Sequence, residues 1–278
     1  MRFCAHSQMF VDDIAEDVDG VFDTVSGFGL DAIEINTPDA ALFPREAVRR
    51  AATRTGLEVV LGTALSLDKS TISDDAAVRR RGVEHLLGCI DIAASLGGTR
   101  VSGGIHSANG TFVGRGRAEA EWERSVLALR EVAPAAEAAN VTLTVEPVSR
   151  YSGYFLNTAD DAIALVDAVG SSHVRVQLDT YHMNLEEDDI PAAIRRVGDR
   201  LAHFHAVENN RGIPGTGQVP WRAVFAALHE IGYTGLIGFE HFPLDLERMA
   251  VRTHTWRAIA SSEEVVVTGP ELLRLAAR

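Results

Sequence analysis

Eight short apolar segments, spread along the whole chain and separated by longer helical stretches, constrain the fold more than any other feature. This alternation is typical of parallel strands joined by crossover helices. Eight such units in 278 residues match the usual size of one closed barrel, so we predict a single α/β domain over residues 1–278, a (β/α)₈ barrel. The expected strands are Arg2–His6, Asp31–Ile35, Glu58–Gly62, Thr99–Gly103, Val141–Glu146, Val174–Asp179, Leu201–His205 and Leu236–Glu240.

The connecting segments carry signals for helix ends. We expect helices over Ala76–Leu96, Arg117–Ala139 and Trp221–Ile231, and glycines follow or end several helical stretches, at Gly97, Gly170 and Gly232. The final stretch, SSEEVVVTGPELLRLAAR, predicts a surface loop and a C-terminal closing helix. No glycine-rich dinucleotide or P-loop motif follows the first strand or occurs elsewhere, which argues against nucleotide-phosphate sites of those kinds.

Charge and composition disfavour several partners. Asp and Glu number 39 against 26 Lys and Arg, a formal charge of −13, so nucleic acid and anionic membranes would be repelled. Cys4 and Cys89 stand alone without metal-ligand spacing, which suits a reducing compartment. Since the sequence also lacks a signal-peptide core and a long apolar span, we expect a soluble cytoplasmic protein.

Four polar residues close strands five to eight of the expected barrel: Glu146, Asp179, His205 and Glu240. In such a barrel, side chains at the C-terminal strand ends meet at one mouth. Any one of them alone could equally be a buried ion pair or a strand-end cap. Three carboxylates and one imidazole in register predict a shared site for a divalent cation, with Mn²⁺, Co²⁺ or Mg²⁺ suited to the oxygen ligands and Zn²⁺ also open.

Four long motifs resemble one family: VEPVSRYSGYFLNT, VQLDTYHMNLEED, HFHAVENNRGIPGTGQVPW and IGFEHF. They are similar to the D-tagatose 3-epimerase / D-allulose (psicose) 3-epimerase group of the sugar phosphate isomerase/epimerase superfamily, and the likeness covers nearly the whole chain. The resemblance implies that Glu146, Asp179, His205 and Glu240 bind one metal, with Mn²⁺ the expected ion. It also implies that Glu146 and Glu240 act as acid and base, and that the enzyme is a homodimer or homotetramer.

Further positions concern the substrate. The resemblance implies that His182 and Arg211 contact sugar oxygens and that His6 lies on the cavity wall. Where the family carries Glu after an Arg-aromatic pair, this chain has Ser152, which leaves room for a substrate that is larger or differently substituted near that end. His106, after strand four, lies at the correct end of the barrel to touch substrate, or is a plain loop residue.

Residues near these positions have plainer interpretations. Glu34, near the end of strand two, is either a site residue or part of a structural ion pair. His203 shares a strand face with His205 but lies one layer deeper, so we expect a hydrogen-bonded core residue. His241 should point to the side opposite Glu240, and Trp221 and Trp256, both in helix-patterned segments, should be packing residues.

The expected activity is metal-dependent ketose 3-epimerisation. With the ketose held through O2 and O3, either Glu146 or Glu240 would remove the C3 proton and the other would return one to the opposite face of the enediolate. Two related activities stay open: isomerisation of a keto sugar or keto-cyclitol, and a lyase reaction, such as dehydration or removal of a 3-oxo-glycoside. An endonuclease and a non-catalytic sugar-binding module are disfavoured, the first by charge and the second by the two glutamates.

Overall fold

The computed structural model describes residues 1–37 and 39–278, and in these residues eight parallel strands close into one barrel in chain order. Strand β1 pairs with β2 on one side and with β8 on the other, which closes the sheet. The predicted barrel is confirmed, and strands differ from their predicted bounds by at most one residue at an end. The strands are β1 (Arg2–His6), β2 (Ala32–Asn36), β3 (Glu58–Gly62), β4 (Arg100–Gly103), β5 (Thr142–Val145), β6 (Val174–Asp179), β7 (Leu201–His205) and β8 (Leu236–Phe239).

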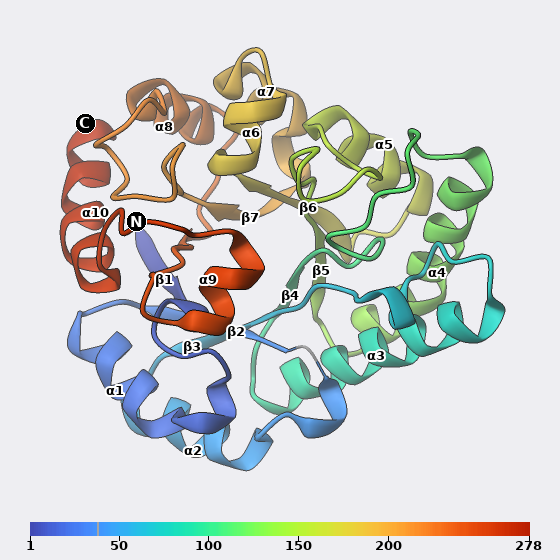
Figure 1. Ribbon diagram of the computed structural model, residues 1–278, viewed down its shortest axis with the longest axis horizontal. Helices are drawn as coiled ribbons and strands as arrows, with labels where there is room; N and C mark the ends of the chain where they lie inside the picture. Colours follow the sequence, from blue (N-terminus) through green and yellow to red (C-terminus); the bar gives the residue numbers. More distant parts are fainter. Residues whose placement is uncertain (38) are drawn as a thin grey trace.

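Helices form a ring around the strands (Figure 1). The three predicted helices are present as α3, α4 and α8, and the glycines at 97, 170 and 232 take the left-handed conformation that helix ends favour. In the described residues the helices are α1 (Val18–Gly27), α2 (Arg45–Thr55), α3 (Ala76–Ser95), α4 (Glu119–Ala138), α5 (Ala159–Val169), α6 (Thr180–Glu186), α7 (Ile190–Val197), α8 (Trp221–Glu230), α9 (Glu247–Thr253) and α10 (Ser262–Ala276).

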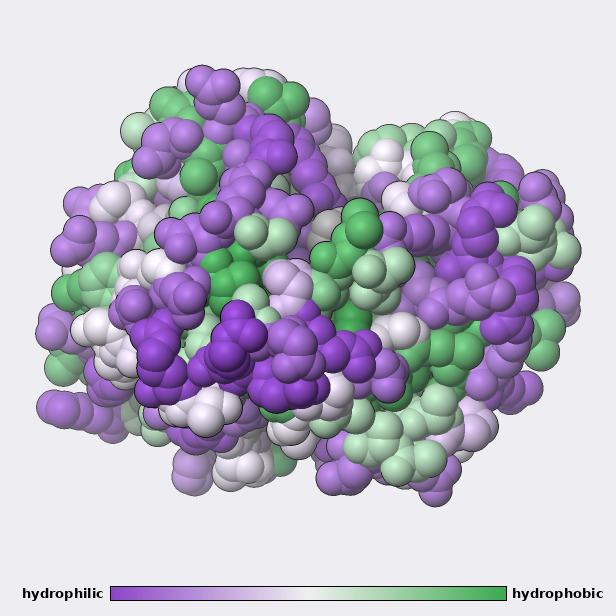
Figure 2. Space-filling view, turned by 90° about the horizontal axis from the view of Figure 1, so that it is seen from below, coloured by the Kyte–Doolittle hydropathy of each residue, from purple (hydrophilic) through white to green (hydrophobic). Residues whose placement is uncertain are grey.

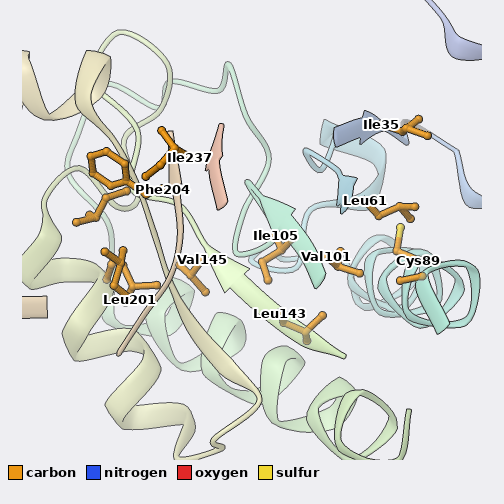
Figure 3. Close-up of a cluster of buried hydrophobic side chains, with 14 of the residues drawn as sticks. Ile35, Leu61, Cys89, Val101, Ile105, Leu143, Val145, Leu201, Phe204 and Ile237 are labelled. Carbon is orange, nitrogen blue, oxygen red and sulfur yellow. The ribbon is translucent and has the colours of Figure 1, made fainter. Parts of the chain in front are cut away.

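The main apolar core fills the space between the strands and the helices. Figure 3 shows side chains from several strands, such as Leu61, Val101 and Phe204, in this layer, with Cys89 of α3 beside Leu61. Because successive side chains of a strand point to opposite faces, the alternate residues point into the barrel. In β7, therefore, Phe204 faces the helices while His203 and His205 face the interior.

The outer surface is mainly polar. Trp256, predicted to be a packing residue of a helix, is instead 68% exposed, because it lies in the loop between α9 and α10. Figure 2 views the molecule from the side on which α1 and α2 lie, and hydrophilic side chains cover most of it, with apolar ones in smaller separate patches. Helix α10 packs against α8 through a face that includes the buried Val265, Val266 and Leu273. Within residues 1–37 and 39–278, no helix is both long enough and apolar enough to cross a bilayer.

Candidate active site

The barrel brings the four strand-end residues of the predicted metal site together. Candidate ligand atoms of Asp179, His205 and Glu240 lie within 4.8 Å of one another, and so do those of Glu146, Asp179 and His182. Asp179 belongs to both groups. It therefore links Glu146, at the end of β5, with Glu240, at the end of β8.

Local structure at the start of α6 fixes the Asp179 carboxylate. This side chain is fully buried, and its Oδ1 accepts a hydrogen bond from the Tyr181 N–H at 2.7 Å, as an N-cap residue does. The other oxygen, Oδ2, lies 3.2 Å from Arg211 Nη1 and 3.9 Å from His205 Nδ1. Oδ1 therefore caps the N-terminus of α6, while Oδ2 faces the candidate metal site.

Crowding of carboxylates sets the electrostatics. Burial raises the pKa of Glu146 well above its usual range, and the nearby Glu240 and Asp179 carboxylates add to the increase. Burial alone would also raise the pKa of Asp179, but Arg211 and His205 outweigh burial and hold that pKa below its ordinary value. A divalent cation between these oxygens would offset their repulsion, so the donor set fits Mn²⁺, Mg²⁺ or Co²⁺.

Arg211 is held from several sides. Its Nη1 donates to the carboxylates of Glu240 and Asp179, and its guanidinium lies over the ring of Tyr181 at 4.0 Å and that of Phe242 at 4.9 Å. Rings on a guanidinium face supply cation–π attraction without using its N–H donors. The arginine is thus fixed in the site while keeping donors for a ligand oxygen.

The hydrogen bonds of His182 indicate which ring nitrogen carries the proton. The Ser149 N–H donates to Nδ1 at 3.0 Å, so Nε2 is the protonated atom in the neutral ring. Burial lowers the pKa of His182 to about 4, which keeps the ring neutral near pH 7. Because Nε2 is then a donor, His182 is better suited to a substrate oxygen than to a metal.

Arg211 Nη2 lies 3.5 Å from His182 Nε2, so two donors stand side by side. An oxygen acceptor beside them would accept from both. The structure therefore brings together the two residues that the sequence predicted as sugar contacts, and their donor chemistry is suited to a hydroxyl or carbonyl oxygen.

Two other predicted substrate residues have partners within the protein. His6 Nδ1 accepts from the Gln8 N–H at 3.3 Å, at the end of β1. His106 donates from Nε2 to the main-chain carbonyl of Glu146 at 2.9 Å, and its Nδ1 lies 2.9 Å from the Ser107 hydroxyl. These contacts give His106 a role in holding the end of β5, and its contact with substrate stays a prediction.

Ser152 lies where the loops after β4 and β5 meet. Its N–H donates to the Ser149 carbonyl and its own carbonyl accepts from the Gly110 N–H, both at 2.7 Å. The neighbouring Arg150 pairs with Glu186, whose oxygens accept from the Arg150 guanidinium and backbone N–H. Glu186 is thus engaged with Arg150.

Residues beneath the mouth complete the arrangement. Of the two interpretations of Glu34, the contacts match the structural pair, since its Oε2 lies 2.8 Å from Nε2 of both His203 and His205. His203 is therefore a hydrogen-bonded core residue, as predicted. His241 points away from the carboxylates and donates from Nδ1 to the Arg211 carbonyl at 2.6 Å, which fixes the backbone of that arginine.

Sequence reasoning missed Glu208, which organises the β7–α8 loop that carries Arg211. This buried carboxylate accepts from the N–H groups of Asn209, Gly215 and Val219 and from the Trp221 indole, at 2.9–3.1 Å. The signal available was an acidic residue three positions before Arg211, but nothing in the sequence indicated that its partners lie up to thirteen residues away.

Comparison with known proteins shows the family to which the chain belongs. The xylose isomerase-like TIM barrel family matches residues 22–265, and the chain belongs to this family. An L-ribulose 3-epimerase of Mesorhizobium japonicum is 35% identical over 231 residues, which cover 82% of this chain and 77% of that protein. A D-psicose 3-epimerase of Enterocloster bolteae is 34% identical over 241 residues, covering 84% and 80%.

Solved structures give the same result. The D-allulose 3-epimerase of a Methylomonas species, in complex with D-allulose, superimposes with a TM-score of 0.94 at 27% identity, over 99% of this chain and 97% of that one. The sequence resemblance to ketose 3-epimerases is therefore confirmed.

The Glu208 contacts generate a prediction. In Glu208→Gln, the amide group would face N–H donors that now meet carboxylate oxygens, so we expect the free energy of unfolding to fall by about 1–3 kcal/mol. The measurement is urea denaturation followed by tryptophan fluorescence. The control is Glu230→Gln, which removes an exposed ion pair with Arg195 and should change stability much less than Glu208→Gln does, because solvent screens an exposed pair. Equal stabilities of the two variants would contradict the role of Glu208.

Proposed function

We propose that this protein is a metal-dependent ketose 3-epimerase that uses Glu146 and Glu240 as its proton carriers. The observation that carries the proposal is the position of these two glutamates. They come from β5 and β8, and each lies within ligand distance of Asp179, but in separate groups. A reaction that removes a proton from one face of a carbon and returns it to the other needs two such groups. The 3-epimerases among its relatives support the assignment.

The reaction starts from the acidity of a C–H bond beside a ketone. One glutamate removes the C3 proton, the electrons of that bond pass toward the C2 carbonyl, and the other glutamate delivers a proton to the opposite face of C3. The roles exchange with the configuration of the substrate. In the metal-free site burial raises the pKa of Glu146 above its ordinary value, so this carboxylate is a stronger base there than a glutamate in water.

Glu146, Asp179, His205 and Glu240 are proposed to bind the divalent metal, with Mn²⁺ as the first choice and Co²⁺, Mg²⁺ or Zn²⁺ as alternatives. When bound, such an ion would supply Lewis-acid stabilisation of the negative charge that develops on the sugar oxygens. His182 and Arg211 are proposed to orient the sugar, since their neighbouring donors are suited to one oxygen acceptor.

The same proton abstraction could begin an isomerisation or an elimination, but the 3-epimerases among the relatives favour epimerisation over both. We place the enzyme in the cytoplasm, as a homodimer or homotetramer. The reduced, buried Cys4 and Cys89 are consistent with that compartment.

The proposal predicts exchange at C3. The protein loaded with Mn²⁺ and incubated with a panel of ketoses in D₂O should produce a C3 epimer that carries deuterium at C3, detected by NMR and mass spectrometry. Glu146→Gln and Glu240→Gln should each lower turnover by at least about 100-fold, because each removes a proton carrier. The two variants should keep the circular dichroism spectrum of the wild type. Epimer without deuterium, or near-normal turnover in either variant, would contradict the mechanism.

Ser152 generates a second prediction, on substrate choice. A serine supplies one small hydroxyl where a glutamate would supply a charge and two acceptors, so we expect low kcat/KM on free D-fructose, D-tagatose and D-allulose. A ketose that is larger or substituted near the C1–C2 end should react faster. Ser152→Glu should raise kcat/KM on the free ketoses by about 10- to 100-fold, the effect of one charge-assisted hydrogen bond.

A matched control is Tyr151→Glu, which adds the same charge to an adjacent side chain that is 74% exposed. It should leave kcat/KM on free ketoses unchanged within about twofold, because an exposed charge is screened by solvent. If the wild type already prefers free ketoses and Ser152→Glu has no effect, the preference for a larger substrate is wrong.

A further inference from the structure

A buried polar cluster lies inside the barrel, directly beneath the candidate metal ligands. It consists of Glu34 from β2, Ser102 from β4, and His203 and His205 from β7, each at most 2% exposed. Glu34 Oε2 lies 2.8 Å from Nε2 of each histidine, and the Ser102 hydroxyl donates to Oε1. The mechanism above uses His205 as a metal ligand but assigns nothing to the other three.

We propose that Glu34 is a positioning residue that holds His205 in the tautomer and orientation required to bind the metal through Nδ1. This inference rests on the proposed function. A histidine binds a metal as the neutral imidazole. Since Glu34 Oε2 is an acceptor, the Nε2 that faces it would carry the one proton of that neutral ring, and the lone pair would be left on Nδ1. Nδ1 lies 3.9 Å from Asp179 Oδ2 and 3.5 Å from the Gln177 amide nitrogen, a donor that also favours an unprotonated Nδ1.

Packing holds the same orientation. A Cβ atom on Gly238 of β8 would lie 2.6 Å from His205 Cδ2, and one on Gly62 of β3 would lie 3.1 Å from Glu34 Oε1. The ring of His203 meets that of His205 edge-on at 4.9 Å. Because these positions are glycines, the His205 ring and the Glu34 carboxylate can lie close to the neighbouring strands. His203 limits rotation of the His205 ring.

Glu34, His203 and His205 could instead bind a metal directly, because their atoms are close enough together. The distances favour hydrogen bonds. Both Nε2 atoms point to one oxygen, and they lie 3.2 Å from each other, so both present protons to that oxygen. A metal there would require both Nε2 atoms to be deprotonated and would lie on the side of the His205 ring opposite the nitrogen that faces Asp179. The experiment separates the two arrangements.

The test is titration of the metal-free protein with Mn²⁺, with free Mn²⁺ measured by electron paramagnetic resonance. The wild type should bind one ion. Glu34→Gln should also bind one ion but with a dissociation constant about 10- to 100-fold higher, the usual effect of removing a carboxylate behind a ligating histidine. Glu34→Asp keeps the charge but withdraws the oxygens from His205, so it should weaken binding to a similar extent.

Three controls make the test specific. Glu121→Gln removes a hydrogen-bonded carboxylate at the start of α4 and should not change the dissociation constant. Asp179→Asn, at the ligand shared by both groups, should raise it more than any Glu34 variant does. His203→Gln should retain one binding site. The melting temperatures of the metal-free variants separate loss of folding from loss of affinity.

Each outcome bears on one claim. A wild type that binds no Mn²⁺, and that Co²⁺, Mg²⁺ and Zn²⁺ do not stabilise against thermal unfolding either, would overturn the proposed function. If the wild type binds Mn²⁺ and Glu34→Gln binds it equally well, the positioning role is overturned. Wild-type affinity in Glu34→Asp would mean that the charge of Glu34 acts and its position does not, which also overturns the proposal. Loss of binding in His203→Gln as complete as in Asp179→Asn would place the ion in the buried cluster and would overturn it as well.

Discussion

The repulsion among three carboxylates at one end of the barrel is the constraint on which the rest of the site depends. Closure of the sheet brings Glu146, Asp179 and Glu240 from three strands to one mouth, where the strands fix the position of each backbone. Arg211 donates to two of them, and the third has a raised pKa. Repulsion among buried carboxylates raises the electrostatic free energy of the metal-free site. Such a site is suited to binding a cation and to proton transfer.

Several residues that would contact the substrate are held in place by hydrogen bonds that involve main-chain carbonyl or N–H groups. His106 donates to the carbonyl of Glu146, His241 donates to the carbonyl of Arg211, and the N–H of Ser149 donates to His182. Glu208 performs the same task for the whole β7–α8 loop. The strand ends therefore set the position of the ligands, and loop contacts set the orientation of the side chains between them.

The sequence predicted the barrel because apolar runs at regular intervals are a direct consequence of parallel strands with buried faces. It predicted the strand-end residues for the same reason, since the last residues of parallel strands meet at one edge. It left Glu34 open and missed the partners of Glu208. The Glu34 contact joins residues 171 positions apart across the barrel, and the Glu208 contacts depend on the path of a loop. Neither follows from local periodicity.

The position of a bound metal tests the account most directly. Crystals of the protein grown with Mn²⁺ and measured near the manganese absorption edge should give one anomalous peak, within about 2.5 Å of oxygens of Glu146, Asp179 and Glu240 and of Nδ1 of His205. A peak between Glu34 and His203, or no peak at the mouth in crystals shown to contain manganese, would contradict the account.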